Sequence, residues 1–142
     1  MIGIVQRFAA IGALPEDTED ERIRKGALTL ASGIVSALAP IWIITYLILD
    51  LPVSAAIPFT YVVISVASLV ALARTKRYRV FRTTQLALLL ALPFALQWSL
   101  GGFIPSSGVA LWALMCPLGA LTFAGTRKAA PWFIAYLTLI AV

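Results

Sequence analysis

The stretch Gln97–Gly108 holds the side chains that could most readily take part in chemistry. Its sequence, QWSLGGFIPSSG, places glycines, serines and an amide between two long apolar blocks and contains no charged residue. A phosphate-binding loop would need a different glycine spacing and a lysine that is missing here. Ser106 and Ser107 have neither a histidine nor a nearby acid that could activate a hydroxyl nucleophile. The stretch therefore predicts a turn or a binding element, and not a catalytic centre.

The other polar residues give no better support for catalysis or for a metal site. The chain has no histidine, which is the commonest metal ligand and general base, and its one cysteine, Cys116, lies in an apolar run where we expect it to pack. Thr18 and Glu21 match a capping box, so the acidic run around them predicts a helix that begins near Glu19 and not a metal site. We expect no catalytic residue, no cofactor and no metal in this chain.

The composition indicates that these residues are carried by membrane helices. The chain of 142 residues is 61% hydrophobic and 12% charged, and its mean hydropathy is +0.97. A soluble domain of this size could not bury so much apolar surface. The net charge of +5 is therefore interpreted as charge flanking the membrane, and we expect no nucleic-acid partner.

Uncharged runs predict an all-α, polytopic transmembrane helix bundle with five apolar segments. A short cytoplasmic segment, residues 1–25, would precede a membrane module that covers 26–142. The first four segments approach the ~20 residues that span a bilayer, whereas the fifth would reach only about 21 Å and is expected to be a truncated span. The expected spans are 26–49, 51–73, 83–100, 107–124 and 129–142.

The positions of the basic residues predict the orientation of the bundle. All eleven lysines and arginines lie before the first segment, between the second and third, or between the fourth and fifth. The positive-inside rule then places the N-terminus in the cytoplasm and Gln97–Gly108 outside. The fifth segment would run outward, and a sixth would be needed to return the chain to the cytoplasm.

The first residues are open to several interpretations. Ile4, Phe8 and Ile11 share one helical face, which predicts an interfacial helix or a segment that packs on a partner domain. A loosely ordered tail is the alternative. Within the spans there is no Asp, Glu, Lys, Arg or His, which argues against an ion-coupled transporter.

Two interpretations of the stretch Gln97–Gly108 are open. As structure, Gly101 and Gly102 permit a tight reversal, Pro105 stops a helix, and Ser106 or Ser107 caps the next one. As function, the stretch forms an outer-face sensing or packing surface, with Trp112 expected to lie deeper in the bundle or to line a pocket. The candidate residues are Gln97, Trp98, Gly101, Gly102, Phe103, Ser106, Ser107, Gly108 and Trp112.

The long run LPFALQWSLGGFIPSSGVALWALMCPLGALTFAGTRKAAPWFIAYLTL resembles the N-terminal membrane region of bacterial class III adenylate/guanylate cyclases, a module that also precedes other signalling domains. The resemblance extends upstream through PEDTEDERIRKGALTL, Trp42 with Tyr46, and Gln85, and covers most of the chain from Pro15 onward. Its most specific elements are Leu100–Phe103, Ser106–Gly108, Leu111–Trp112 and Pro117–Leu121.

The resemblance implies a six-helix module ahead of a cytoplasmic catalytic domain that works as a dimer. No active-site residue of those cyclases can be placed on this chain, so the chain alone is not expected to make cyclic nucleotide. We therefore expect a membrane-anchoring, dimerisation and sensor module of the bacterial inner membrane. Its partners would be the lipid bilayer, a second copy of the chain and a cytoplasmic output domain in cis or in trans. The alternatives are the same module from a sensor kinase, or a free-standing membrane protein such as a transporter subunit or assembly factor.

Overall fold

The computed structural model describes residues 2–141, and every regular element in that range is a helix, which confirms the all-α prediction. Six α-helices and two short 3₁₀ helices follow one another along the chain. They are α1 (Ile2–Ala9), η1 (Ala10–Gly12), α2 (Glu19–Ile48), α3 (Pro52–Thr75), α4 (Tyr78–Ser99), η2 (Val109–Leu114), α5 (Met115–Ala124) and α6 (Thr126–Ile140).

Three of the helices are long and apolar enough to cross a bilayer: α2, α3 and α4. A shorter apolar helix covers Val109–Ala124, and α6 has 15 residues. Many large apolar side chains point away from the protein, among them Ile48 and Val53. So much exposed apolar surface is unusual for a soluble monomer, so it indicates a membrane protein.

The starts of the helices follow local sequence signals more closely than they follow the limits of the apolar blocks. Helix α2 begins at Glu19, as expected, because Thr18 and Glu21 form the complete capping box. The helix therefore starts well before the apolar block at residue 26, and its first turns carry charge. Helix α4 likewise begins at Tyr78, ahead of the uncharged run, so Arg79 and Arg82 are helical residues.

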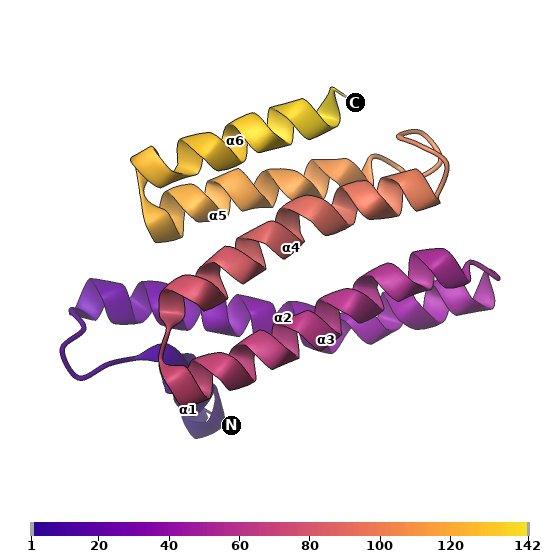
Figure 1. The fold of residues 1–142 in the computed structure, drawn as a ribbon. Helices are drawn as coiled ribbons and strands as arrows, with labels where there is room; N and C mark the ends of the chain where they lie inside the picture. The colour runs from indigo at the N-terminus through magenta and orange to yellow at the C-terminus, as the bar shows by residue number, and fades with distance from the viewer. Residues whose placement is uncertain (1, 142) are drawn as a thin grey trace.

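The helices form two antiparallel pairs that are joined by α4 (Figure 1). Helices α2 and α3 lie side by side, as do α5 and α6, and α4 crosses between the two pairs. One end of the molecule holds α1, the start of α2, the α3–α4 turn and the α5–α6 turn. The opposite end holds the α2–α3 turn and the 100–108 loop. We call these the basic end and the loop end, because all eleven basic residues lie in the segments at the former.

Two hydrophobic clusters hold these pairs together. The larger one joins α4 to η2, α5 and α6 through Leu86, Leu90, Phe94, Ala110, Ala113, Cys116, Ala120, Ala129 and Tyr136. Cys116 is fully buried there, which confirms it as a packing residue. The smaller cluster, Leu28, Leu72 and Phe81, joins α2, α3 and α4 near the basic end.

Candidate functional site

The loop between α4 and η2 is a tight reversal that depends on its glycines. Gly101, Gly102 and Gly108 have φ values of 90°, 115° and 68°, which side chains with a Cβ rarely adopt. The amide of Gly102 donates to the Gln97 carbonyl at 2.9 Å, and that of Gly108 donates to the Phe103 carbonyl at 2.9 Å. The backbone thus satisfies itself within the loop, as expected for a hairpin between two helices.

The prediction that Ser106 or Ser107 caps the next helix is wrong. The residue before η2 is Gly108, and no side chain caps that helix. The Ser106 hydroxyl instead donates to the Phe103 carbonyl at 3.1 Å inside the loop, whereas Ser107 is exposed with a φ of 54°. The next helix begins as a 3₁₀ turn from a left-handed glycine, so no serine is placed to cap it.

The expectation that Trp112 lies deep in the bundle is also wrong, because its side chain is 69% exposed. Residues 109–114 form a 3₁₀ helix, in which residues three apart lie on the same face. Ala110 and Ala113 occupy the inward face and are fully buried, so Trp112 is turned outward. An α-helical interpretation of this segment places the faces differently.

The structure brings the candidate residues together at the loop end of the molecule. Trp98 and Phe103 are, like Trp112, exposed apolar side chains. The carboxamide oxygen of Gln97 is buried without a hydrogen-bond partner among the described residues. None of the nine candidates lines either of the two pockets found near the basic end.

A buried polar cluster lies in the middle of the bundle and was not predicted as a site from the sequence. Gln85 is 1% exposed, and its amide nitrogen donates to the hydroxyls of Ser65 at 3.0 Å and Ser68 at 3.1 Å. The Tyr61 hydroxyl donates to the Gln85 amide oxygen at 3.3 Å. The polar atoms of Gln85 are thus all paired, which an apolar surrounding requires. The available signal was a glutamine at the start of one apolar block and serines at helical spacing in another.

At the basic end, an ion pair fixes the chain just before α2. The Lys25 ammonium lies 2.6 and 2.7 Å from the two oxygens of the Asp17 carboxylate, which also accepts the Leu14 amide at 2.7 Å. Both side chains are largely shielded from solvent. The hydrogen bonds from Lys25, and then that from Leu14, lower the pKa of Asp17 below its ordinary value of 3.8.

The segment before this ion pair packs on its own chain. Phe8 of α1 lies so close to Gly33 that a Cβ there would be 2.7 Å from the Phe8 ring. The Lys76 ammonium donates to the Ile11 carbonyl at 2.6 Å, and Gly12 lies against Leu72. The first residues thus pack on α2 and α3 of their own chain, whereas the predicted packing on a partner domain stays a prediction.

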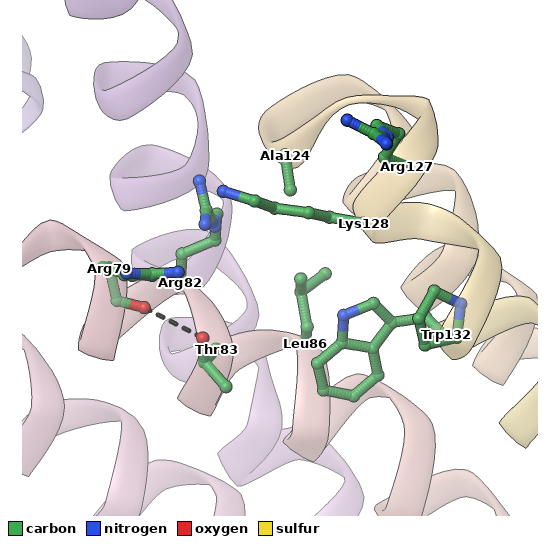
Figure 2. A pocket seen from close by; sticks show the side chains of 9 residues that line it. Arg79, Arg82, Thr83, Leu86, Ala124, Arg127, Lys128 and Trp132 are labelled. Carbon is green, nitrogen blue, oxygen red and sulfur yellow. Dashed lines mark hydrogen bonds between the residues drawn. The ribbon is translucent and has the colours of Figure 1, made fainter.

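A pocket with a volume of about 390 Å³ lies at the basic end between α4 and α6. From the sequence, the cations of this pocket predicted only the topology. Their proximity could not be expected, because α4 and α6 are far apart along the chain. Figure 2 shows Lys128 extended from α6 toward Arg82 on α4, with the Trp132 indole beside Leu86. The pocket is lined by Arg79, Arg82, Thr83, Leu86, Ala124, Arg127, Lys128, Pro131 and Trp132.

Over residues 2–141, no group of three or more His, Cys, Asp or Glu side chains is arranged to hold a metal ion. Comparisons of the chain with protein-family models, curated proteins and solved structures gave no match.

Proposed function

We propose that the chain is a polytopic module of five membrane-embedded helical segments that anchors, dimerises and regulates a cytoplasmic output domain. The output domain is of the class III adenylate/guanylate cyclase type, as the sequence resemblance implies, and the membrane is the bacterial inner membrane. The chain itself contributes the membrane part and no catalytic group.

The charge distribution supports the orientation in which the basic end faces the cytoplasm. All eleven basic residues belong to segments at that end, whereas the two connections at the loop end carry one ionisable side chain, Asp50. Basic residues are retained on the cytoplasmic side during membrane insertion. The loop end then faces the outside of the cell.

The observation that carries the regulatory part is the set of polar contacts along α4. At the loop end, the Ser99 hydroxyl is 2.9 Å from that of Ser54 on α3. In mid-bundle, Gln85 bonds to Ser65 and Ser68 of α3. At the basic end, the Arg82 guanidinium donates to the Phe123 carbonyl of α5 at 3.0 Å.

These contacts give α4 fixed partners along its whole length, so a displacement at its outer end is transmitted toward the cytoplasm. The candidate sensing surface adjoins that outer end, with exposed Trp98 and Phe103 beside the unpartnered oxygen of Gln97. A stimulus would act by binding one packing arrangement of α4 more tightly than another, since equal affinity would shift nothing. Lipid or a small apolar molecule fits the chemistry of this surface.

Labelling of single cysteines tests the orientation. With the native thiol removed as Cys116→Ala, we expect Ile104→Cys, at a side chain that is 88% exposed, to react with a membrane-impermeant maleimide on intact cells. Arg127→Cys, at the basic end, should react only after lysis. The reverse pattern would overturn the orientation.

The coding DNA beyond codon 142 tests the assignment to a signalling protein. A continuous frame that encodes a further span and a cyclase domain would support the proposal. A kinase domain there would assign the module to a different output. A stop codon, together with stable membrane insertion of the 142-residue product, would favour a free-standing membrane protein.

A further inference from the structure

We propose that the pocket between α4 and α6 binds the phosphate group of an anionic phospholipid. The inference rests on the membrane placement proposed above, because that placement puts the basic end at the cytoplasmic headgroup layer. The chemistry recognised is a phosphate with an apolar portion attached, and the source is a lipid of the inner leaflet.

The pocket carries positive charge that no acidic side chain compensates. Four cationic side chains line the pocket, Arg79, Arg82, Arg127 and Lys128, and no acidic residue does. The two ion pairs among the described residues, Arg24 with Asp20 and Lys25 with Asp17, lie outside the pocket. Like charges brought together repel, and a phosphate placed between them relieves that repulsion.

The geometry of two of these cations, Arg82 and Lys128, suits a shared anion. Figure 2 shows the Lys128 side chain extended across the pocket with its ammonium group directed toward the Arg82 guanidinium. One guanidinium nitrogen of Arg82 is held by the Phe123 carbonyl at 3.0 Å, which positions the group before any ligand arrives. Its remaining donors can bind a phosphate in the planar manner that guanidinium groups favour.

One wall of the pocket is apolar. Leu86, Pro131 and Trp132 line it, and Leu86 is almost fully buried. Basic pockets between helices on the cytoplasmic side bind lipid headgroups, and tryptophan favours the same layer. A free phosphate ion would use the cations alone, whereas a phospholipid would also use this wall. A volume of about 390 Å³ also exceeds the need of a single phosphate ion.

The test compares two variants of equal charge in the full chain, purified in detergent and stripped of lipid. The pocket variant, Arg79→Gln with Lys128→Gln, removes two side chains that make no hydrogen bond or ion pair within residues 2–141. The control, Arg74→Gln with Arg77→Gln, removes two exposed cations at the same end but outside the pocket. Native mass spectrometry measures the bound fraction during titration with phosphatidylglycerol, phosphatidic acid and phosphatidylcholine.

We expect the two anionic lipids to bind in preference to phosphatidylcholine. Their affinity should fall roughly tenfold in the pocket variant and less than about twofold in the control, since each interfacial cation near an anionic lipid contributes measurably. A third variant, Arg82→Lys, keeps the charge but loses the planar fork, and it should also bind more weakly than the parent protein.

Four results would overturn the proposal. Equal losses in the pocket variant and the control would mean that attraction is diffuse over the basic end. Binding of inorganic phosphate alone, with the same dependence on Arg79 and Lys128 and with displacement of the lipid, would assign the pocket to a soluble phosphate. Equal retention of all three lipids would exclude charge recognition. Alkaline extraction of membranes distinguishes failure of the pocket proposal from failure of the proposed function. Protein that resists extraction is embedded in the membrane, so if it retains no lipid, only the pocket proposal is overturned.

Discussion

The basic end and the loop end stabilise their polar groups in different ways. At the basic end, charged side chains hold segments that are distant in sequence, as Lys76 does with Ile11 and Arg82 with Phe123. At the loop end, the reversal is held by backbone amides and by glycines with positive φ, and the aromatic side chains point outward. Side-chain charge thus organises the basic end, whereas local backbone conformation organises the loop end.

The largest expected effect comes from breaking the loop end at its backbone. Gly102 has a φ of 115°, so we expect Gly102→Val to destabilise the protein by about 1–3 kcal/mol through strain. Ser107→Gly is the control, because Ser107 already adopts a positive φ of 54° and loses only a side chain exposed to solvent. Unfolding in mixed micelles, followed by tryptophan fluorescence, measures both. A cost for Ser107→Gly as large as that for Gly102→Val would contradict the backbone explanation.

The polar contacts that α4 makes inside the bundle can be tested by the same substitution at two of its glutamines, Gln85 and Gln97. Gln85→Leu leaves the hydroxyls of Ser65 and Tyr61 without their partner, so we expect a loss of about 1–2 kcal/mol. Gln97→Leu removes a buried oxygen that has no partner among the described residues. The same unfolding measurement should show Gln97→Leu to be neutral or stabilising. A larger loss at Gln97 than at Gln85 would refute this assignment of the polar contacts.

Acid should loosen the basic end and leave the loop end unchanged. The pKa of Asp17 is lowered in the folded protein by its hydrogen bonds to Lys25 and Leu14. Its contribution to stability is therefore complete above the ordinary value of 3.8 and is lost as the pH falls through the lower folded value. A spin label at Glu16 should become mobile in that acidic range, whereas a label at Ile104 should not.

The control for this pH dependence is the neutral carboxamide. Asp17→Asn should make the Glu16 label mobile at every pH, because the carboxylate that binds Lys25 is gone. Asp20→Asn removes a solvent-exposed pair with Arg24 and should leave the label unchanged, since exposed ion pairs contribute little. If the label responds equally to both substitutions, the acid effect is general and does not arise from Asp17.

The sequence was most informative where a local signal determines the structure. Thr18 and Glu21 predicted the start of α2 because a capping box needs only residues three apart. The glycines at 101 and 102 predicted a reversal, since few other residues adopt their φ values. The long apolar blocks predicted five membrane segments, and three of these blocks coincide with helices long and apolar enough to cross a bilayer.

Features that depend on packing could not be predicted in the same way. The outward position of Trp112 follows from a 3₁₀ geometry that shares its apolar composition with an α-helix. The basic pocket exists because α4 and α6 bring Arg82 and Lys128 together across a long stretch of sequence. The role of Asp17 was missed because the acidic run was interpreted as a helix start, and nothing local distinguishes its side chain from Asp20 or Glu21.

The smallest expected effect concerns the contact between Ser54 and Ser99, which joins α3 to α4 at the loop end. Their hydroxyls are 2.9 Å apart, and Ser99 also donates to the carbonyl of Leu96. A double-mutant cycle with Ser54→Ala and Ser99→Ala should give a coupling of about 0.6 kcal/mol, the average for hydrogen bonds between membrane helices. A coupling near zero would remove the loop-end contact of α4 from the proposed transmission path. A coupling of this size would confirm that the loop end has a specific side-chain link to α3 in addition to its glycine-dependent backbone.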